Sequence, residues 1–392
     1  MSIRGGQFVM DDSSIKATPA TLNASQINGN IDVTADQVLL SNHSTVDTSA
    51  GGGVNVKRST GNITFNVNTF SATDSTISSP GFGNAPGPGV SQSGAVTIQG
   101  LQGAGTSANS VSLNNTTVDT SNSGFSVGDA GPILIRAGNI TLNQTVLDAR
   151  ARARNGGSGG AISLLSSGSI EAVNTTITSV HEGNGGSEPS GPIELRAGDK
   201  IDLTNTGIDA FTFAFRPGTI TLVSPIMSLS GSTLRVFIDE DFPAGSINLT
   251  ATKAISLTNG TVLNADNGAG SNGGTIHIDG GAKFTSDHST ISAQSRLGNG
   301  GTIQVEAKKV DMTATQVTTA TSGGPQTVGG TITIDANKAT FNNSQVLSTA
   351  TEGHGGTIGI TAHKLNSIDS VIDASSQSGT NGTVTINGVI QP

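Results

Sequence analysis

The side chains that could do chemistry are few and scattered. Adjacent carboxylates occur only at Asp11-Asp12 and in the run Asp239–Asp241, which could offer oxygen ligands to calcium. Cysteine is absent, which excludes a disulfide scaffold, a thiolate metal site and a cysteine nucleophile. The histidines have no metal-ligand spacing; they are His43, His181, His277, His288, His354 and His363. The sequence therefore predicts no metal, no cofactor and a solvated loop at 239–241.

Three phenylalanines alternate at Phe211, Phe213 and Phe215, so all three should share one face of a strand. On an outer face they would form an apolar partner patch, and on an inner face a bulky core layer. We favour the core or a covering loop.

Three arginines also alternate, at Arg150, Arg152 and Arg154, and we expect them to point to solvent. There they could contact anionic glycans. The chain has no Trp and no Tyr, however, which removes the usual stacking platforms for sugars.

Composition narrows the class of protein further. The net charge is -9 over 392 residues, so the composition gives no indication of a basic surface that would bind nucleic acid. The sequence contains no run of about 20 apolar residues, so it predicts no transmembrane helix. The first residues, Met1 to Gly6, lack the apolar core of a signal peptide.

One short phrase recurs along the whole chain: Gly, a small residue or Pro, then Ile or Val, any residue, and another apolar residue. Its clearest copies are Gly274–Ile278, Gly301–Val305, Gly330–Ile334 and Gly356–Ile360. The first apolar residue of each copy is called the anchor here. The thirteen anchors are Ile31, Ile63, Val96, Ile133, Ile162, Ile193, Ile220, Ile247, Ile276, Ile303, Ile332, Ile358 and Val384.

The spacing of the anchors, 26 to 37 residues, predicts an array of stacked coils. Each period holds two or three short alternating strands, expected to be three to five residues long, and no helical stripe. Such a unit cannot bury its apolar face alone, but stacking buries it. We predict an all-β chain forming a parallel β-helix of about 13 coils, as a single repeat domain over residues 1–392. The opening strands, near Gly5–Val9 and Ser13–Ala17, should belong to an earlier coil.

An asparagine recurs at one turn of the coil, in Asn115, Asn174, Asn205, Asn259 and Asn343. Asn tolerates the left-handed conformation that a sharp turn needs. The residue type fits either turn propensity alone or a hydrogen-bonded ladder between coils.

The Gly-Gly-Thr-Ile phrase, followed by a polar strand such as Ser289–Ala293, resembles the filamentous haemagglutinin-like exoproteins of two-partner secretion. The resemblance covers nearly the whole chain, as a likeness of repeats. It implies a right-handed parallel β-helix, export through a partner outer-membrane transporter, and an adhesin role at the surface of a Gram-negative cell. The family's signal peptide and secretion domain have no match here, so we expect the chain to be a fragment, a split gene or a truncated piece.

Parallel β-helices also include polysaccharide-degrading enzymes, the pectate lyases and polygalacturonases. Gly353-His354-Gly355 resembles the short Gly-His-Gly element of polygalacturonases, but their Asn-Thr-Asp and Arg-Ile-Lys elements are missing. The acidic run Asp239–Asp241 lies far from His354 in the array, and we see no carboxylate cluster repeated on one outer face. We therefore expect His354 to be a plain turn residue.

The sequence favours a non-enzymatic, surface-exposed β-helical segment of an adhesin-like protein. Its partner would be a glycan or protein on a host or neighbouring cell. A polysaccharide-degrading enzyme is the alternative from another class, and a passive stalk is a third.

Overall fold

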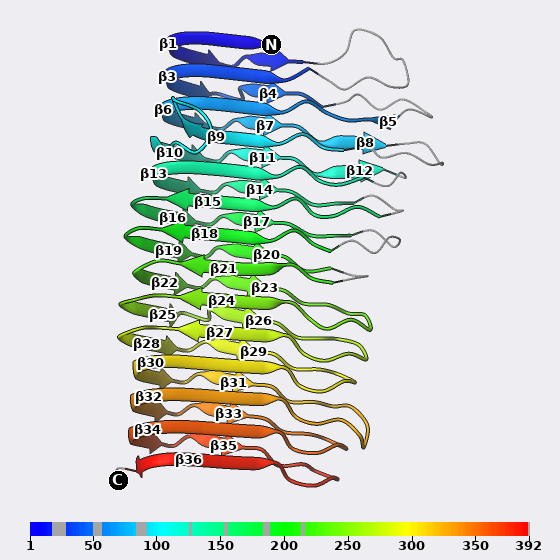
Figure 1. The fold of residues 1–392 in the computed structure, drawn as a ribbon, viewed down its shortest axis with the longest axis vertical. Coiled ribbons are helices and arrows are strands. Elements are labelled where there is room, and N and C mark those ends of the chain that lie inside the picture. Colours follow the sequence, from blue (N-terminus) through cyan, green and yellow to red (C-terminus); the bar gives the residue numbers. More distant parts are fainter. Residues whose placement is uncertain are drawn as a thin grey trace. The chain divides into compact units, whose positions relative to one another are not determined.

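The computed structural model describes residues 1–17, 29–49, 57–83, 92–124, 128–152, 156–182, 189–212 and 216–390. Across these residues every regular element is a β-strand, so none of them forms a helix that could span a membrane. Parallel strands stack as a β-solenoid of about 12 turns, which confirms the predicted all-β parallel fold (Figure 1). The chain divides into two compact units, described separately below.

Unit 1 comprises Met1–Asp199 and Thr206–Ala214. Its first set of parallel strands is β1 (Ser2–Asp11), β3 (Ile31–Ser41), β6 (Ile63–Thr73), β9 (Val96–Gly100), β10 (Ala108–Asn114), β13 (Ile133–Asn143), β15 (Ile162–Ser166), β16 (Ser169–Val173) and β18 (Ile193–Ala197). The second set is β2 (Ser14–Lys16), β4 (Thr45–Asp47), β7 (Thr76–Ser78), β11 (Thr117–Asp119), β14 (Val146–Asp148), β17 (Thr176–Thr178) and β20 (Gly207–Asp209). A small third sheet contains β5 (Lys57–Arg58), β8 (Gly81–Gly83) and β12 (Asn122–Gly124).

Unit 2 comprises Lys200–Asn205 and Phe215–Pro392. Its first set is β19 (Lys200–Thr204), β21 (Thr219–Val223), β22 (Ile226–Ser230), β24 (Ser246–Thr250), β25 (Ala254–Thr258), β27 (Thr275–Asp279), β28 (Lys283–Asp287), β30 (Thr302–Thr313), β32 (Thr331–Asn342), β34 (Thr357–Ile368) and β36 (Thr383–Ile390). The second set is β23 (Thr233–Arg235), β26 (Val262–Asn264), β29 (Thr290–Ser292), β31 (Gln316–Thr318), β33 (Gln345–Leu347) and β35 (Val371–Asp373).

The anchors set the register in both units. In unit 1, Ile31 pairs with Ile63 and so on in sequence to Ile193, and in unit 2 the same succession runs from Ile220 to Val384. Every anchor except Val384 is at most 1% exposed. The two-residue alternation of each strand thus places the anchors in the core and their neighbours outside.

The strands differ from the prediction in length. We expected three to five residues, but β30, β32 and β34 have 12 each. Each continues past a corner of the coil, where β27 and β28 are instead parted by the turn at Gly280–Ala282. The sequence marks this corner, because Gly280-Gly281 and one extra residue stand where the longer strands continue, and Gly281 has a φ of 57°.

The asparagine turn is confirmed. Asn115, Asn174, Asn205, Asn259 and Asn343 all have a φ between 46° and 55°. Asn115 Nδ2 donates to Asp74 Oδ1 of the preceding turn at 2.6 Å, and Asn259 Nδ2 donates to Ser230 Oγ at 2.8 Å. Bonds between turns therefore exist at this position, and in these two cases the acceptors are Asp and Ser.

Candidate functional site

The arginines predicted as a partner patch lie against carboxylates. Arg150 holds Asp148 with two bonds, Nε to Oδ1 at 2.9 Å and Nη2 to Oδ2 at 2.6 Å. It also reaches Glu182 Oε1 at 3.3 Å, and Arg152 pairs with Asp148 at 3.1 Å and Glu182 at 3.4 Å. Arg154 lies outside the described residues.

These four groups carry two positive and two negative charges. The hydrogen bond that Arg150 donates to Asp148 is the main reason that the pKa of Arg150 rises above its ordinary value. The arginine side chains keep 30% and 36% of their surface exposed, so an anionic glycan would have to compete with carboxylates already in place. Binding of a partner by these arginines stays a prediction.

Of the phenylalanine patch, only Phe211 is described, since Phe213 and Phe215 lie outside the described residues. Phe211 is half-buried, and its carbonyl oxygen accepts a 2.5 Å bond from Ser190 Oγ. The next residue, Thr212, is fully buried and bridges His181 of the neighbouring turn. Phe211 is thus neither a core residue nor a freely exposed one, and the patch stays a prediction.

The acidic run Asp239–Asp241 forms part of a loop. Asp241 Oδ1 accepts the backbone N–H of Gly270, one turn on, at 3.1 Å. Within the described ranges, no three His, Cys, Asp or Glu side chains gather closely enough to hold a metal ion. The turn that holds the acidic run is separated from the turn of Ala350, near His354, by four successive β-bridges. At about 4.8 Å per bridge, this distance is on the order of 20 Å.

His354 occupies an exposed loop. Its Nδ1 lies 2.5 Å from Thr380 Oγ1 in the next turn, and its backbone bonds Thr327 and Gly329. A shallow hollow of about 590 Å³ beside it includes Glu352. The surroundings supply one nearby carboxylate but not the acidic run at Asp239–Asp241.

One corner of unit 2 carries charges that repeat from turn to turn. Asp279, Glu306 and Asp335 pair in register and form what we call the carboxylate column. It lines a shallow groove of about 500 Å³ together with Lys308 and His363. The expectation that no carboxylate cluster repeats on one outer face is therefore wrong. The signal was present in the sequence, because each of these residues comes three positions after an anchor.

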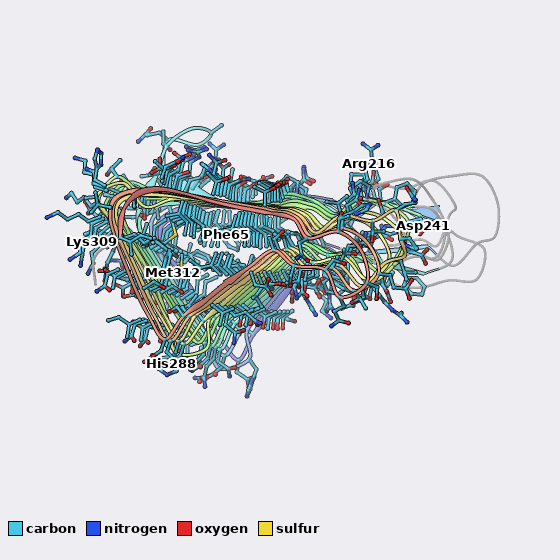
Figure 2. The ribbon with its side chains drawn as sticks, turned by 90° about the horizontal axis from the view of Figure 1, so that it is seen from below. Phe65, Arg216, Asp241, His288, Lys309 and Met312 are labelled. Carbon is cyan, nitrogen blue, oxygen red and sulfur yellow. The ribbon has the colours of Figure 1, made fainter. Side chains whose placement is uncertain are left out.

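A second column lies across the same corner. Lys283, Lys309, Lys338 and Lys364 pair in register through successive turns, and we call them the lysine column. Figure 2 shows Lys309 at the outer corner, with Met312 of the same strand pointing into the coil. Sequence reasoning missed this column, although three of its members follow an anchor by six residues.

Comparison with known proteins gives no relative: no protein-family model, no curated protein and no solved structure matches this chain.

Proposed function

We propose that this chain is a non-enzymatic contact segment of an adhesin-like protein, exposed at a cell surface or secreted. The observation that carries the proposal is the repetition of one surface position through successive turns. Thr275, Thr302, Thr331, Thr357 and Thr383 pair in register and are all exposed. A surface that repeats once per turn offers an extended partner the same contact many times, which multiplies weak contacts into avidity.

The wider setting of the proposal comes from the sequence resemblance. It includes a right-handed winding, export through a partner outer-membrane transporter, and a location at a Gram-negative outer surface. The partner would be a glycan or protein on a host or neighbouring cell.

The carboxylate column supports a second candidate, a polysaccharide-degrading β-helix enzyme. Carboxylates beside a basic side chain are what acid–base cleavage of a glycan needs, and Lys308 and His363 line the same groove. Glu306, however, accepts a hydrogen bond from Gln304, and Asp279 accepts the N–H of Gly281 at 3.0 Å. These bonds fit a structural role, so the contact function is our conclusion.

Two measurements on the purified chain separate these candidates. Beads coated with it should adhere to bacterial or epithelial cells, while beads coated with the heat-denatured chain should not. In parallel, pectin and polygalacturonate should stay uncleaved, with or without calcium. Cleavage that disappears in Glu306→Gln or His354→Ala would replace the adhesin by the enzyme, and absence of adhesion together with absence of cleavage would leave a passive stalk.

A further inference from the structure

Positive charge concentrates at the corner of unit 2 that carries the lysine column. The whole chain has a net charge of -9 and only nine lysines. Six of the nine lie at this corner or directly beside it: Lys253, Lys283, Lys308, Lys309, Lys338 and Lys364. Lys253 belongs here because it precedes Ala254, the register partner of Lys283.

Most of the lysine column has no acidic partner of its own. In the part of the chain that the structure describes, Lys309 pairs with Asp311, whereas Lys283, Lys338 and Lys364 lie in no ion pair and are exposed. Hydrogen bonds within the strand or turn already engage Glu306 and Asp279 of the carboxylate column. The ammonium groups of Lys283, Lys338 and Lys364 are therefore available to an external anion, whereas that of Lys309 is shared with Asp311.

The stacking itself is unfavourable without such an anion. Neighbouring parallel strands lie about 4.8 Å apart, and like charges placed directly opposite one another destabilise a sheet. Four lysines in successive turns place like charges opposite one another at three steps, and Asp311 offsets the charge of Lys309, which takes part in two of them. An anion with a matching repeat would relieve the repulsion at every step.

We propose that the lysine column binds a linear acidic polysaccharide with one carboxylate per sugar, lying along the direction in which the turns stack. One sugar residue is similar in length to the spacing between successive turns, which is about 4.8 Å. Each carboxylate can therefore meet one lysine. The hydroxyl groups of the sugars can donate to the neighbouring carboxylate column. This inference deepens the proposed contact function and rests on it for its setting, but the binding itself needs only the purified chain.

Duplex nucleic acid fits the same corner less well. B-DNA carries one charge per roughly 1.7 Å, far denser than one lysine per turn. The carboxylate column beside the lysines would repel that density. Single strands need aromatic platforms for their bases, but the chain has no Trp or Tyr, and Phe284 and Phe341, on the same strands as Lys283 and Lys338, are fully buried.

The test measures binding of sodium polygalacturonate to the full chain by calorimetry at low salt. The fourfold variant K283Q/K309Q/K338Q/K364Q should bind about tenfold or more weakly, and its affinity should depend less on salt. A matched control, R4Q/K16Q/K200Q/R296Q, removes the same charge elsewhere and should bind like the parent. Fourfold replacement by Arg should keep binding, and circular dichroism should show the same strand content in every variant.

Equal weakening in the matched control would overturn the proposal, because net charge alone would then explain the affinity. So would absence of polygalacturonate binding, or tighter binding of duplex DNA that the lysine variant loses. Adhesion of coated beads that survives in the lysine variant, together with absent polygalacturonate binding, would overturn this partner while keeping the contact function.

Discussion

At the scale of single residues, adjacent positions on one strand tolerate charge very differently. Ile303 is fully buried, whereas the side chain of Gln304 next to it reaches the surface. Ile303→Asp places a carboxylate among apolar side chains without a partner and should destabilise the fold by several kcal/mol. Gln304→Asp should change stability by no more than about 0.5 kcal/mol. Urea unfolding of both variants checks the register, and equal losses would show it to be wrong.

The turn position that Asn favours holds Ala in one place. Ala314 has a φ of 45°, in the left-handed region where a Cβ is unfavourable. Ala314→Gly should therefore raise the stability by about 0.5–1 kcal/mol, despite the greater freedom of Gly in the unfolded chain.

Ala336 is the matched control, because it lies within β32 and outside the positive-φ set. Ala336→Gly should lower stability by a similar amount. If Ala314→Gly lowered the melting temperature as Ala336→Gly does, the strain at this turn would not exist.

At the scale of the elements, one carboxylate between β26 and the loop that follows responds to pH. Burial raises the pKa of Asp266, against bonds from Ser292, the Gln294 N–H and Asn264 that lower it. A raised pKa means that the folded chain binds more protons than the unfolded chain, so stability falls as pH rises from the ordinary Asp range through the folded pKa.

Asp266→Asn removes this ionisation, so its stability should vary less with pH across that interval, and the difference from the parent should shift in favour of the variant toward neutral pH. Thermal unfolding from pH 3 to 7 measures both. A constant difference between parent and variant at every pH would contradict the assignment.

The lysine column makes a prediction about stability as well as binding. Lys338 lies between Lys309 and Lys364 in register, so Lys338→Gln should raise the melting temperature at low salt, and the gain should shrink as salt screens the repulsion. Lys16→Gln is the control, since Lys16 lies 3.9 Å from Asp47 and should gain nothing. A gain independent of salt would point to a cause other than charge.

How far the sequence predicts the elements depends on whether their spacing is visible. The anchors and the Asn turns repeat as residue types, so their strands and corners could be predicted. The charged columns were missed although most of their members keep a fixed distance from an anchor, because the residue type changes, as in Asp279, Glu306 and Asp335, and because Lys283 follows its anchor by seven residues rather than six. Only the strand register, set at the turn Gly280–Ala282, aligns Lys283 with Lys309.

At the scale of the whole molecule, the repeat pattern predicted the stacked parallel coils but not the chemistry of their surface. Twelve of the thirteen anchors are buried because each coil must cover the apolar face of the next. Surface positions carry no such constraint, so the arginines near Asp148 could be placed by alternation but not paired. Their partner Glu182 comes from the following turn, 32 residues beyond Arg150.

A solenoid of this kind should lose stability locally, because each turn contacts only its neighbours. Ile303→Ala opens a cavity in β30, which pairs with β27 and β32. Amide hydrogen exchange should accelerate in these three strands and keep its parent rate in β3 and β6 of unit 1. The surface change Gln304→Ala should leave all five strands unchanged. Equal acceleration in every strand after Ile303→Ala would mean that the two units unfold together as one cooperative structure.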